Sequence, residues 1–240
     1  MEIDILFKDD ALVVINKPAG LATLPDGFDP TLPHIKSTLE GQLGALWIVH
    51  RLDKGTSGVL ILARTAEAHR SLNTQFERHQ VSKVYHALVM GNPEWDEKTV
   101  DLPLRSNGDR KHRTVVDLRH GKPATTRLNV IERFGAFSLL EAIPETGRTH
   151  QIRAHLCAAG LSIVGDALYR RKLPNQKSEL TSKLPASNES PQFRPAGMGL
   201  HARSLEVNHP LTGERMKFIA PYPDEWGAVL KVIRAGPSVF

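Results

Sequence analysis

Polar and charged side chains crowd residues 50–58, which read His-Arg-Leu-Asp-Lys-Gly-Thr-Ser-Gly and lie between two apolar runs. These runs, LWIV and VLILAR, are expected to form buried strands that hold the segment as a loop. Asp53 is the residue best suited to chemistry, because a carboxylate can attack an electrophilic centre or stabilise developing positive charge. When the segment is considered alone, a turn-capping role for Asp53 is the simpler interpretation.

A second polar segment, Thr-Gly-Arg-Thr-His-Gln-Ile-Arg at residues 146–153, follows an apolar strand pattern and begins a helical one. His150 and Arg153 are three residues apart, so they can share one face of that helix. The first N–H groups of a helix are free to bind an anion such as a phosphate. Helix capping and surface ion pairs are again the simpler interpretation of this segment alone.

The elements that must position these two segments are mostly strands. The first 20 residues predict a hairpin, residues 65–79 and 150–160 predict helices, and Trp226, Val229, Leu230 and Ile233 predict a final amphipathic helix. Residues 23–45 show no clear periodicity. Further strand patterns lie at residues 83–91, 125–134, 136–145, 161–165, 200–207 and 215–223. We therefore expect an α/β protein of the α+β type, with a mixed, largely antiparallel central sheet flanked by helices.

Length and composition indicate a globular protein, and we expect one domain over residues 1–240. No apolar run approaches the roughly 20 residues needed to span a membrane, and the first residues are acidic rather than basic, so we expect a cytoplasmic protein. The single cysteine, Cys157, excludes an internal disulfide and is expected in the core. A net charge of +5 permits a polyanionic partner without requiring one.

Taken together, the two polar segments resemble the RluA family of pseudouridine synthases, whose motifs include HRLD followed by Thr-Ser-Gly and, later, GRTHQ(I/L)R. The similarity continues in family order over nearly the whole chain. It includes NKPAGL at 16–21, KVYHALVMG at 83–91, GKPATT at 121–126, SIVGDALY at 162–169 and GLHARSLEVNHP at 199–210. The chain is identified from these motifs as a member of that family.

The resemblance implies a role for each matching position. Asp53 corresponds to the catalytic aspartate, Tyr85 to the active-site tyrosine, and Arg153 to the arginine that pairs with the aspartate. Leu200 corresponds to a leucine that lines the pocket, and Arg51 to an arginine that helps fill the gap left by an extruded base. The remaining residues expected to bind the substrate are His50, Leu52, Thr56, Arg148, His150 and Gln151.

The implied reaction is the isomerisation of uridines in tRNA, in large-subunit rRNA, or in both. It involves no net redox change, so no cofactor and no metal are expected. The uridine must be flipped out of the RNA, and stacking on Tyr85 would offset part of the cost of flipping. In a route through a glycal, Asp53 or Tyr85 could take a proton from the ribose.

Several expectations concern the rest of the chain. Residues 170–198 contain six Lys or Arg against two Glu and little apolar sequence, so we expect a flexible basic insertion that contacts RNA through Arg170, Arg171 and Lys172, or else a solvated loop. A strand pattern starts within a few residues of Met1, so no N-terminal RNA-binding module of the S4 type is expected. A monomer is the default expectation.

Two other classes of function compete with this prediction. A protein that binds RNA without catalysis would have no chemical reason to keep Asp53, Tyr85 and Arg153 together. A metal-dependent hydrolase is suggested by the eleven histidines, but no HExxH motif is present, and His150 and His155 would point about 140° apart on a helix that turns about 100° per residue. Both alternatives are therefore disfavoured.

Overall fold

The computed structural model describes residues 3–27, 29–170 and 197–235. The basic insertion predicted at residues 170–198 therefore lies almost entirely outside the described residues. Four helices are described: α1 (Ile35–Leu43), α2 (Ala66–Glu77), α3 (Gln151–Ala158) and α5 (Asp224–Ala235). The strands are β1 (Asp4–Lys8), β2 (Leu12–Lys17), β3 (Trp47–Ile48), β4 (Ser57–Ala63), β5 (Ser82–Met90), β6 (Glu97–Asp101), β7 (Leu104–Arg105), β8 (Val115–Val116), β9 (Thr125–Phe134), β10 (Phe137–Pro144), β11 (Ser162–Ile163), β12 (Leu200–Asn208) and β13 (Arg215–Ile219).

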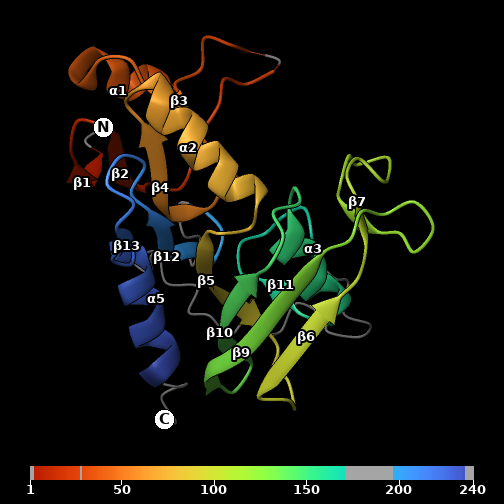
Figure 1. The fold of residues 1–240 in the computed structure, drawn as a ribbon. Coiled ribbons are helices and arrows are strands. Elements are labelled where there is room, and N and C mark those ends of the chain that lie inside the picture. The colour runs from red at the N-terminus through yellow and green to blue at the C-terminus, as the bar shows by residue number, and fades with distance from the viewer. Residues whose placement is uncertain (1–2, 28, 171–196, 236–240) are drawn as a thin grey trace.

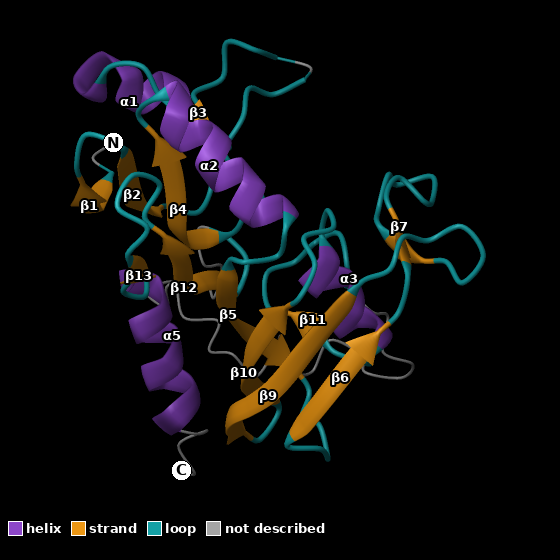
Figure 2. Cartoon of the chain, in the orientation of Figure 1, coloured by secondary structure: helices purple, strands orange, loops and turns teal. Residues whose placement is uncertain are grey.

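Eleven of these strands form one sheet in the described part of the chain, and β7 and β8 form a separate two-stranded sheet. The main path of the large sheet runs β1-β2-β4-β12-β5-β10-β9-β6, with β3, β11 and β13 pairing at its sides. Among the described strands, only β4 and β12 pair in parallel. The mixed, largely antiparallel sheet predicted from the sequence is confirmed (Figures 1 and 2).

Helices cover both faces of the sheet near its N-terminal edge. Strands β2 and β4 are apolar at successive positions because each face of these strands is buried. Val14 and Ile61 pack on one face with Ala68 and Leu72 of α2. On the other face, Val13 and its neighbours pack with Ile35, Leu39 and Leu43 of α1. The loop that follows β3 is consequently attached to a rigid part of the molecule.

The other half of the sheet is built in the same way. Val89 of β5 packs with Ile152 and Leu156 of α3, whereas the preceding residue of the strand, Leu88, packs with Trp226 of α5. Successive strand residues point to opposite faces, so α3 and α5 lie on opposite sides of β5. The second polar segment begins α3 and is therefore held against the centre of the sheet.

Three expectations need correction. Residues 34–43 were not predicted to be regular, yet they form a capped helix in which the ring of His34 accepts a hydrogen bond from the Ser37 N–H. The apolar run before the first polar segment forms only the two-residue strand β3. Cys157 is half-buried at the edge of a small apolar cluster, because its neighbours on α3 occupy the core.

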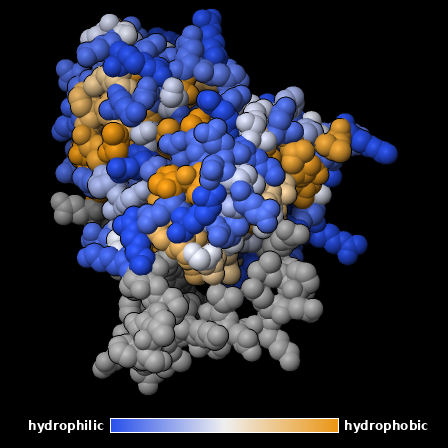
Figure 3. Space-filling model, turned by 90° about the horizontal axis from the view of Figure 1, so that it is seen from below, coloured by the Kyte–Doolittle hydropathy of each residue, from blue (hydrophilic) through white to orange (hydrophobic). Residues whose placement is uncertain are grey.

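Hydrophilic residues cover most of the surface seen from below, and hydrophobic residues form small separate patches there (Figure 3). None of the described helices is long and apolar enough to span a bilayer.

Candidate active site

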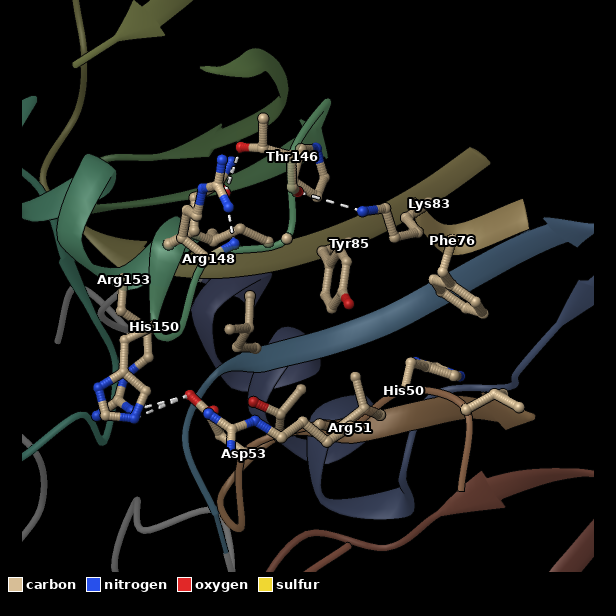
Figure 4. Close-up of a pocket in the computed structure, with 18 residues that line it drawn as sticks. His50, Arg51, Asp53, Phe76, Lys83, Tyr85, Thr146, Arg148, His150 and Arg153 are labelled. Carbon is tan, nitrogen blue, oxygen red and sulfur yellow. Dashed lines mark hydrogen bonds and ion pairs between the residues drawn. The ribbon is translucent and has the colours of Figure 1, made fainter. Parts of the chain in front are cut away.

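The two polar segments meet at one cavity of about 330 Å³. This volume lies at the lower end of the range usual for small-molecule sites. Tyr85 projects into the cavity from β5, between the loop that carries Arg51 and Asp53 and the loop that carries Thr146 and Arg148 (Figure 4). All of the predicted site residues line it: His50, Arg51, Leu52, Asp53, Thr56, Tyr85, Arg148, His150, Gln151, Arg153 and Leu200.

Asp53 and Arg153 form an ion pair across 100 residues of sequence. The Arg153 Nη1 donates to Asp53 Oδ2 at 2.9 Å, and His150 Nε2 lies 3.6 Å from the same oxygen (Figure 4). About a quarter of the Asp53 side chain is exposed, at 24%. The carboxylate is therefore oriented by a cation and is still accessible from the cavity.

Arg153 is held by a second carboxylate. Its Nε and Nη2 donate to the two oxygens of Asp166 at 2.7 and 2.9 Å. Burial acts to lower the pKa of Arg153, but the ion pairs with Asp166 and Asp53 outweigh burial and raise it. Burial likewise acts to raise the pKa of Asp166, and Arg153 outweighs it and lowers that pKa. A bidentate pair of this kind fixes the plane of the guanidinium.

Tyr169 and His150 complete the surroundings of Arg153. The Tyr169 ring lies against the guanidinium at 4.8 Å, and the Tyr169 hydroxyl lies 3.1 Å from His150 Nδ1. His150 has a φ of 52°, in the left-handed region that few residues other than glycine adopt. Burial lowers the pKa of His150, with partial opposition from Asp53. The ring is therefore mainly neutral at pH 7.

The loop that carries Asp53 is fastened by backbone contacts. Thr56 N–H donates to Asp53 O at 2.9 Å and closes the turn. The buried ammonium of Lys17 donates to Pro18 O, Leu21 O and Lys54 O, which ties this turn to the loop after β2. Gly58, with a φ of 110°, lets β12 approach, because a Cβ at Gly58 would lie 2.2 Å from Ala202 O. The position of Asp53 is thus set by β2, β4 and β12, which carry Lys17, Gly58 and Ala202.

Tyr85 stands on β5 between two alanines of the neighbouring strands, Ala142 and Ala202. Cross-strand partners share a face of the sheet, so the ring is flanked within the sheet by two small side chains. Burial, with a contribution from Asp53, raises the pKa of the Tyr85 phenol. The phenol therefore keeps its proton at neutral pH, which argues against Tyr85 as the base that takes a proton from ribose.

A family model described as RNA pseudouridylate synthase matches residues 11–158. The chain belongs to this family. The family predicted from the two polar segments is thereby confirmed.

Relatives within the pseudouridine synthases cover nearly the whole chain. The ribosomal large subunit pseudouridine synthase D of Nitrosomonas europaea is 38% identical over 241 residues, which are 97% of this chain and 66% of that protein. This chain therefore spans slightly less than two thirds of that relative. The dual-specificity RNA pseudouridine synthase RluA of Salmonella typhi is 36% identical over 90% of this chain and 92% of that protein. Human RNA pseudouridylate synthase domain containing 4 superposes with a TM-score of 0.75 at 27% identity, over 96% of this chain and 93% of that structure.

Several predicted substrate-binding residues of this family member are engaged by the protein itself. The Gln151 amide accepts from Thr146 Oγ1 and Arg148 N and donates to Thr125 O, so it shapes the 146–148 loop. His50 Nε2 accepts from Ile61 N, and burial lowers the pKa of His50 to about 3. Both residues line the cavity, but these contacts make them part of its wall.

The other predicted residues are placed as follows. Arg51 is exposed at the rim, where it donates to Thr149 Oγ1 at 3.0 Å and so joins the two polar segments. Leu52 and Leu200 are buried and supply apolar wall, and Thr56 is also buried. His155 does not join His150. Its ring instead contacts Thr126 and Leu102 O, and among the described residues no cluster of three His, Cys, Asp or Glu could hold a metal ion.

Sequence reasoning missed four residues of the candidate site. Lys17, Asp166 and Tyr169 lie in motifs that carry the resemblance, but the sequence alone indicates no role for them. Lys83 lines the cavity and donates to Thr146 O, and burial lowers its pKa. The sequence offers one signal for Asp166 and Tyr169. Both lie within SIVGDALY, and a surface turn would not require an acid and a tyrosine at these positions.

Proposed function

We propose that this protein is an RNA pseudouridine synthase in which Asp53 carries out the chemistry on a flipped uridine. The observation that carries the proposal is the Asp53 carboxylate, which is held by Arg153 at 2.9 Å and faces a cavity that also contains Tyr85. A carboxylate fixed in this way is available as a nucleophile or as a counter-charge for a cationic transition state. Membership of the family supports the assignment.

The reaction is an isomerisation that leaves the composition of the nucleotide unchanged. The bond between ribose C1′ and uracil N1 breaks, the uracil turns, and a bond forms between C1′ and C5. The hydrogen on C5 leaves as a proton, and N1 gains a proton. Asp53 is the group that assists departure of the uracil, either by bonding to the nucleotide or by stabilising positive charge on the sugar. Arg153 keeps the Asp53 carboxylate pointed at the reacting centre.

Base flipping fits the walls of the cavity. Extruding a base costs a few kcal/mol, and stacking on an aromatic ring contributes about 1–3 kcal/mol. Tyr85 provides such a ring, and its protonated hydroxyl can donate a hydrogen bond to the uracil. Arg51 at the rim is positioned to enter the space that the base leaves.

The substrate that we propose is tRNA, large-subunit rRNA, or both, because the relatives carry names of both kinds: a ribosomal large subunit enzyme and a dual-specificity RNA enzyme. We further propose that the protein acts as a monomer in the cytoplasm and needs neither a metal nor another cofactor. The chemistry supports this proposal, since the isomerisation moves bonds without a net change of oxidation state.

The test is to incubate the protein separately with unmodified tRNA transcripts and with a large-subunit rRNA transcript. Carbodiimide labelling followed by reverse transcription then locates pseudouridine, which has the same mass as uridine. We expect new stops at one or a few defined uridines. If the protein binds both RNAs but forms pseudouridine in neither, that result would contradict the proposed activity and leave RNA binding as the function.

A further inference from the structure

A basic hairpin stands out from the sheet beside the candidate active site. Residues 103–122 link β6 to β9, and they contain the separate β7–β8 sheet (Figures 1 and 2). Residues 104–122 carry six Lys or Arg against two Asp. We call residues 103–122 the basic hairpin.

Its two acids are already paired within the hairpin. Arg105 binds Asp117 at 2.6 Å, and Arg113 binds Asp109 at 2.7 Å. The remaining four cations, Arg110, Lys111, Arg119 and Lys122, are exposed, and none of them pairs with a carboxylate among the described residues. The hairpin therefore presents a surplus of free positive charge.

The hairpin also has a defined shape. Asp117 accepts hydrogen bonds from the N–H groups of Arg119 and His120, and Gly121 N–H donates to Asp117 O at 2.8 Å. A side chain at Gly121 would collide with the backbone, because its Cβ would lie 2.4 Å from Asp117 O. This tight turn holds Leu118 outward, with 77% of the residue exposed. The positive charges are thus carried by an element with a defined backbone conformation.

The base of the hairpin is joined to the rim of the cavity. Leu104 packs in one apolar cluster with Ala154 of α3 and with Tyr169. The Tyr169 hydroxyl accepts from Thr114 N at 2.8 Å, and Tyr169 in turn contacts both His150 and Arg153. Directly after the hairpin in the sequence, Pro123 O accepts from Arg148 Nε of the cavity at 3.1 Å. The hairpin is consequently held in a fixed position relative to Asp53.

We propose that the basic hairpin is a docking arm for the RNA backbone outside the flipped uridine. Arg110, Lys111, Arg119 and Lys122 would contact phosphates, and Leu118 would lie against a neighbouring ribose or unstacked base. Phosphate contacts position a protein on a nucleic acid without reading its sequence. The proposal rests on the proposed function, because it names where that RNA lies. It also assigns a role to the first residues of the GKPATT motif, which close the hairpin.

The test compares two triple variants with the same change of charge. The hairpin variant is Arg110→Gln, Lys111→Gln and Arg119→Gln. The control is Lys8→Gln, Arg70→Gln and Lys98→Gln, whose residues are exposed on β1, α2 and β6, do not line the cavity and do not pair with a carboxylate among the described residues. Binding of a large-subunit rRNA transcript and of a tRNA transcript is measured by filter retention as salt increases.

For the hairpin variant, we expect the Kd for RNA to rise about tenfold or more at moderate salt, with a slope of log K against log salt smaller by about 2–3. Its rate of pseudouridine formation at saturating RNA should match wild type. The control should bind nearly as wild type does. Equal weakening of both variants would overturn the proposal in favour of a general effect of net charge. Unchanged binding by the hairpin variant would also overturn it.

The two readouts separate this proposal from the proposed function. Binding is measured without catalysis, so a wild-type protein that forms no pseudouridine would contradict the activity while the comparison of variants still tests the hairpin.

Discussion

Asp166 binds Arg153 through two hydrogen bonds, at 2.7 and 2.9 Å, and so leaves the third nitrogen of the guanidinium to Asp53. The side chain of Asp166 is only 1% exposed, whereas that of Asp53 is 24% exposed. One carboxylate therefore anchors the arginine and the other faces the cavity. The proposed chemistry of Asp53 depends on this division of roles.

Asp166→Asn should lower kcat at least tenfold, a loss of about 1.4 kcal/mol, and leave the KM for RNA nearly unchanged. The amide keeps the shape of the side chain but presents a donor to the guanidinium, so Arg153 loses its fixed orientation. Steady-state pseudouridine formation measures both constants. The pH profile of kcat should also shift, because Arg153 changes its position relative to Asp53.

Asp166→Glu is the matched variant, since it keeps the charge and lengthens the side chain. We expect it to recover part of the kcat that Asp166→Asn loses. If both variants kept the wild-type kcat and pH profile, Asp166 would not position Arg153.

Arg153→Ala should reduce stability as well as activity. Removing the guanidinium leaves Asp166 buried without its cation, and breaking a buried pair in this way typically costs about 3–5 kcal/mol. Urea unfolding measures the loss. Arg153→Ala combined with Asp166→Ala should recover part of it, because the buried charge is then gone. Equal stability of Arg153→Ala and wild type would show that the pair contributes little.

Tyr85→Phe and Tyr85→Ala separate the ring from the hydroxyl. If stacking is the main role, Tyr85→Phe should keep RNA binding, whereas Tyr85→Ala should lose about 1–3 kcal/mol of it. Because the pKa of Tyr85 is raised, its hydroxyl should stay protonated when the pH increases towards the ordinary pKa of a tyrosine. Any hydrogen bond that this hydroxyl donates to RNA should therefore persist over that pH range. Binding of an RNA substrate to the three proteins checks the order. Tighter binding by Tyr85→Ala than by Tyr85→Phe would contradict it.

His201 makes the fold sensitive to acid. Its ring is fully buried between Ser57 Oγ, at 2.9 Å, and Ala220 O, and burial lowers its pKa to about 4 from an ordinary value near 6.5. A lowered folded-state pKa means that the unfolded chain binds the proton more readily, so stability should fall as the pH decreases from about 6.5 to about 4.

The contribution of His201 between pH 7 and pH 5 should be about 1–2 kcal/mol. His201→Gln keeps a hydrogen-bonding side chain that does not titrate, so its unfolding free energy should fall less over the same range. Urea unfolding of both proteins at the two pH values makes the comparison. An identical decrease in both would exclude His201 as a source.

The placement of Asp53 near Arg153 could be predicted only from the family resemblance of the two polar segments, because each segment alone is interpreted more simply as a cap of a turn or of a helix. The contacts of Lys17 could not, since a lysine is rarely buried and nothing in its neighbours shows that three carbonyl groups converge on it. Asp166 lies in a motif that carries the resemblance, but its partner is set by how α3 packs on β11. The helix α1 was missed because its cap is His34, an uncommon capping residue, and because Gly41 interrupts its pattern.

The most direct test of the account is tritium release from RNA labelled at uridine C5, with wild-type protein compared with Asp53→Asn. The asparagine keeps the size of the side chain, and Arg153 retains Asp166, so the variant should fold and bind RNA. We expect that the wild type releases tritium and that the variant, with RNA bound, releases none above background. Release by Asp53→Asn at the wild-type rate would contradict the assignment of Asp53 to the chemistry.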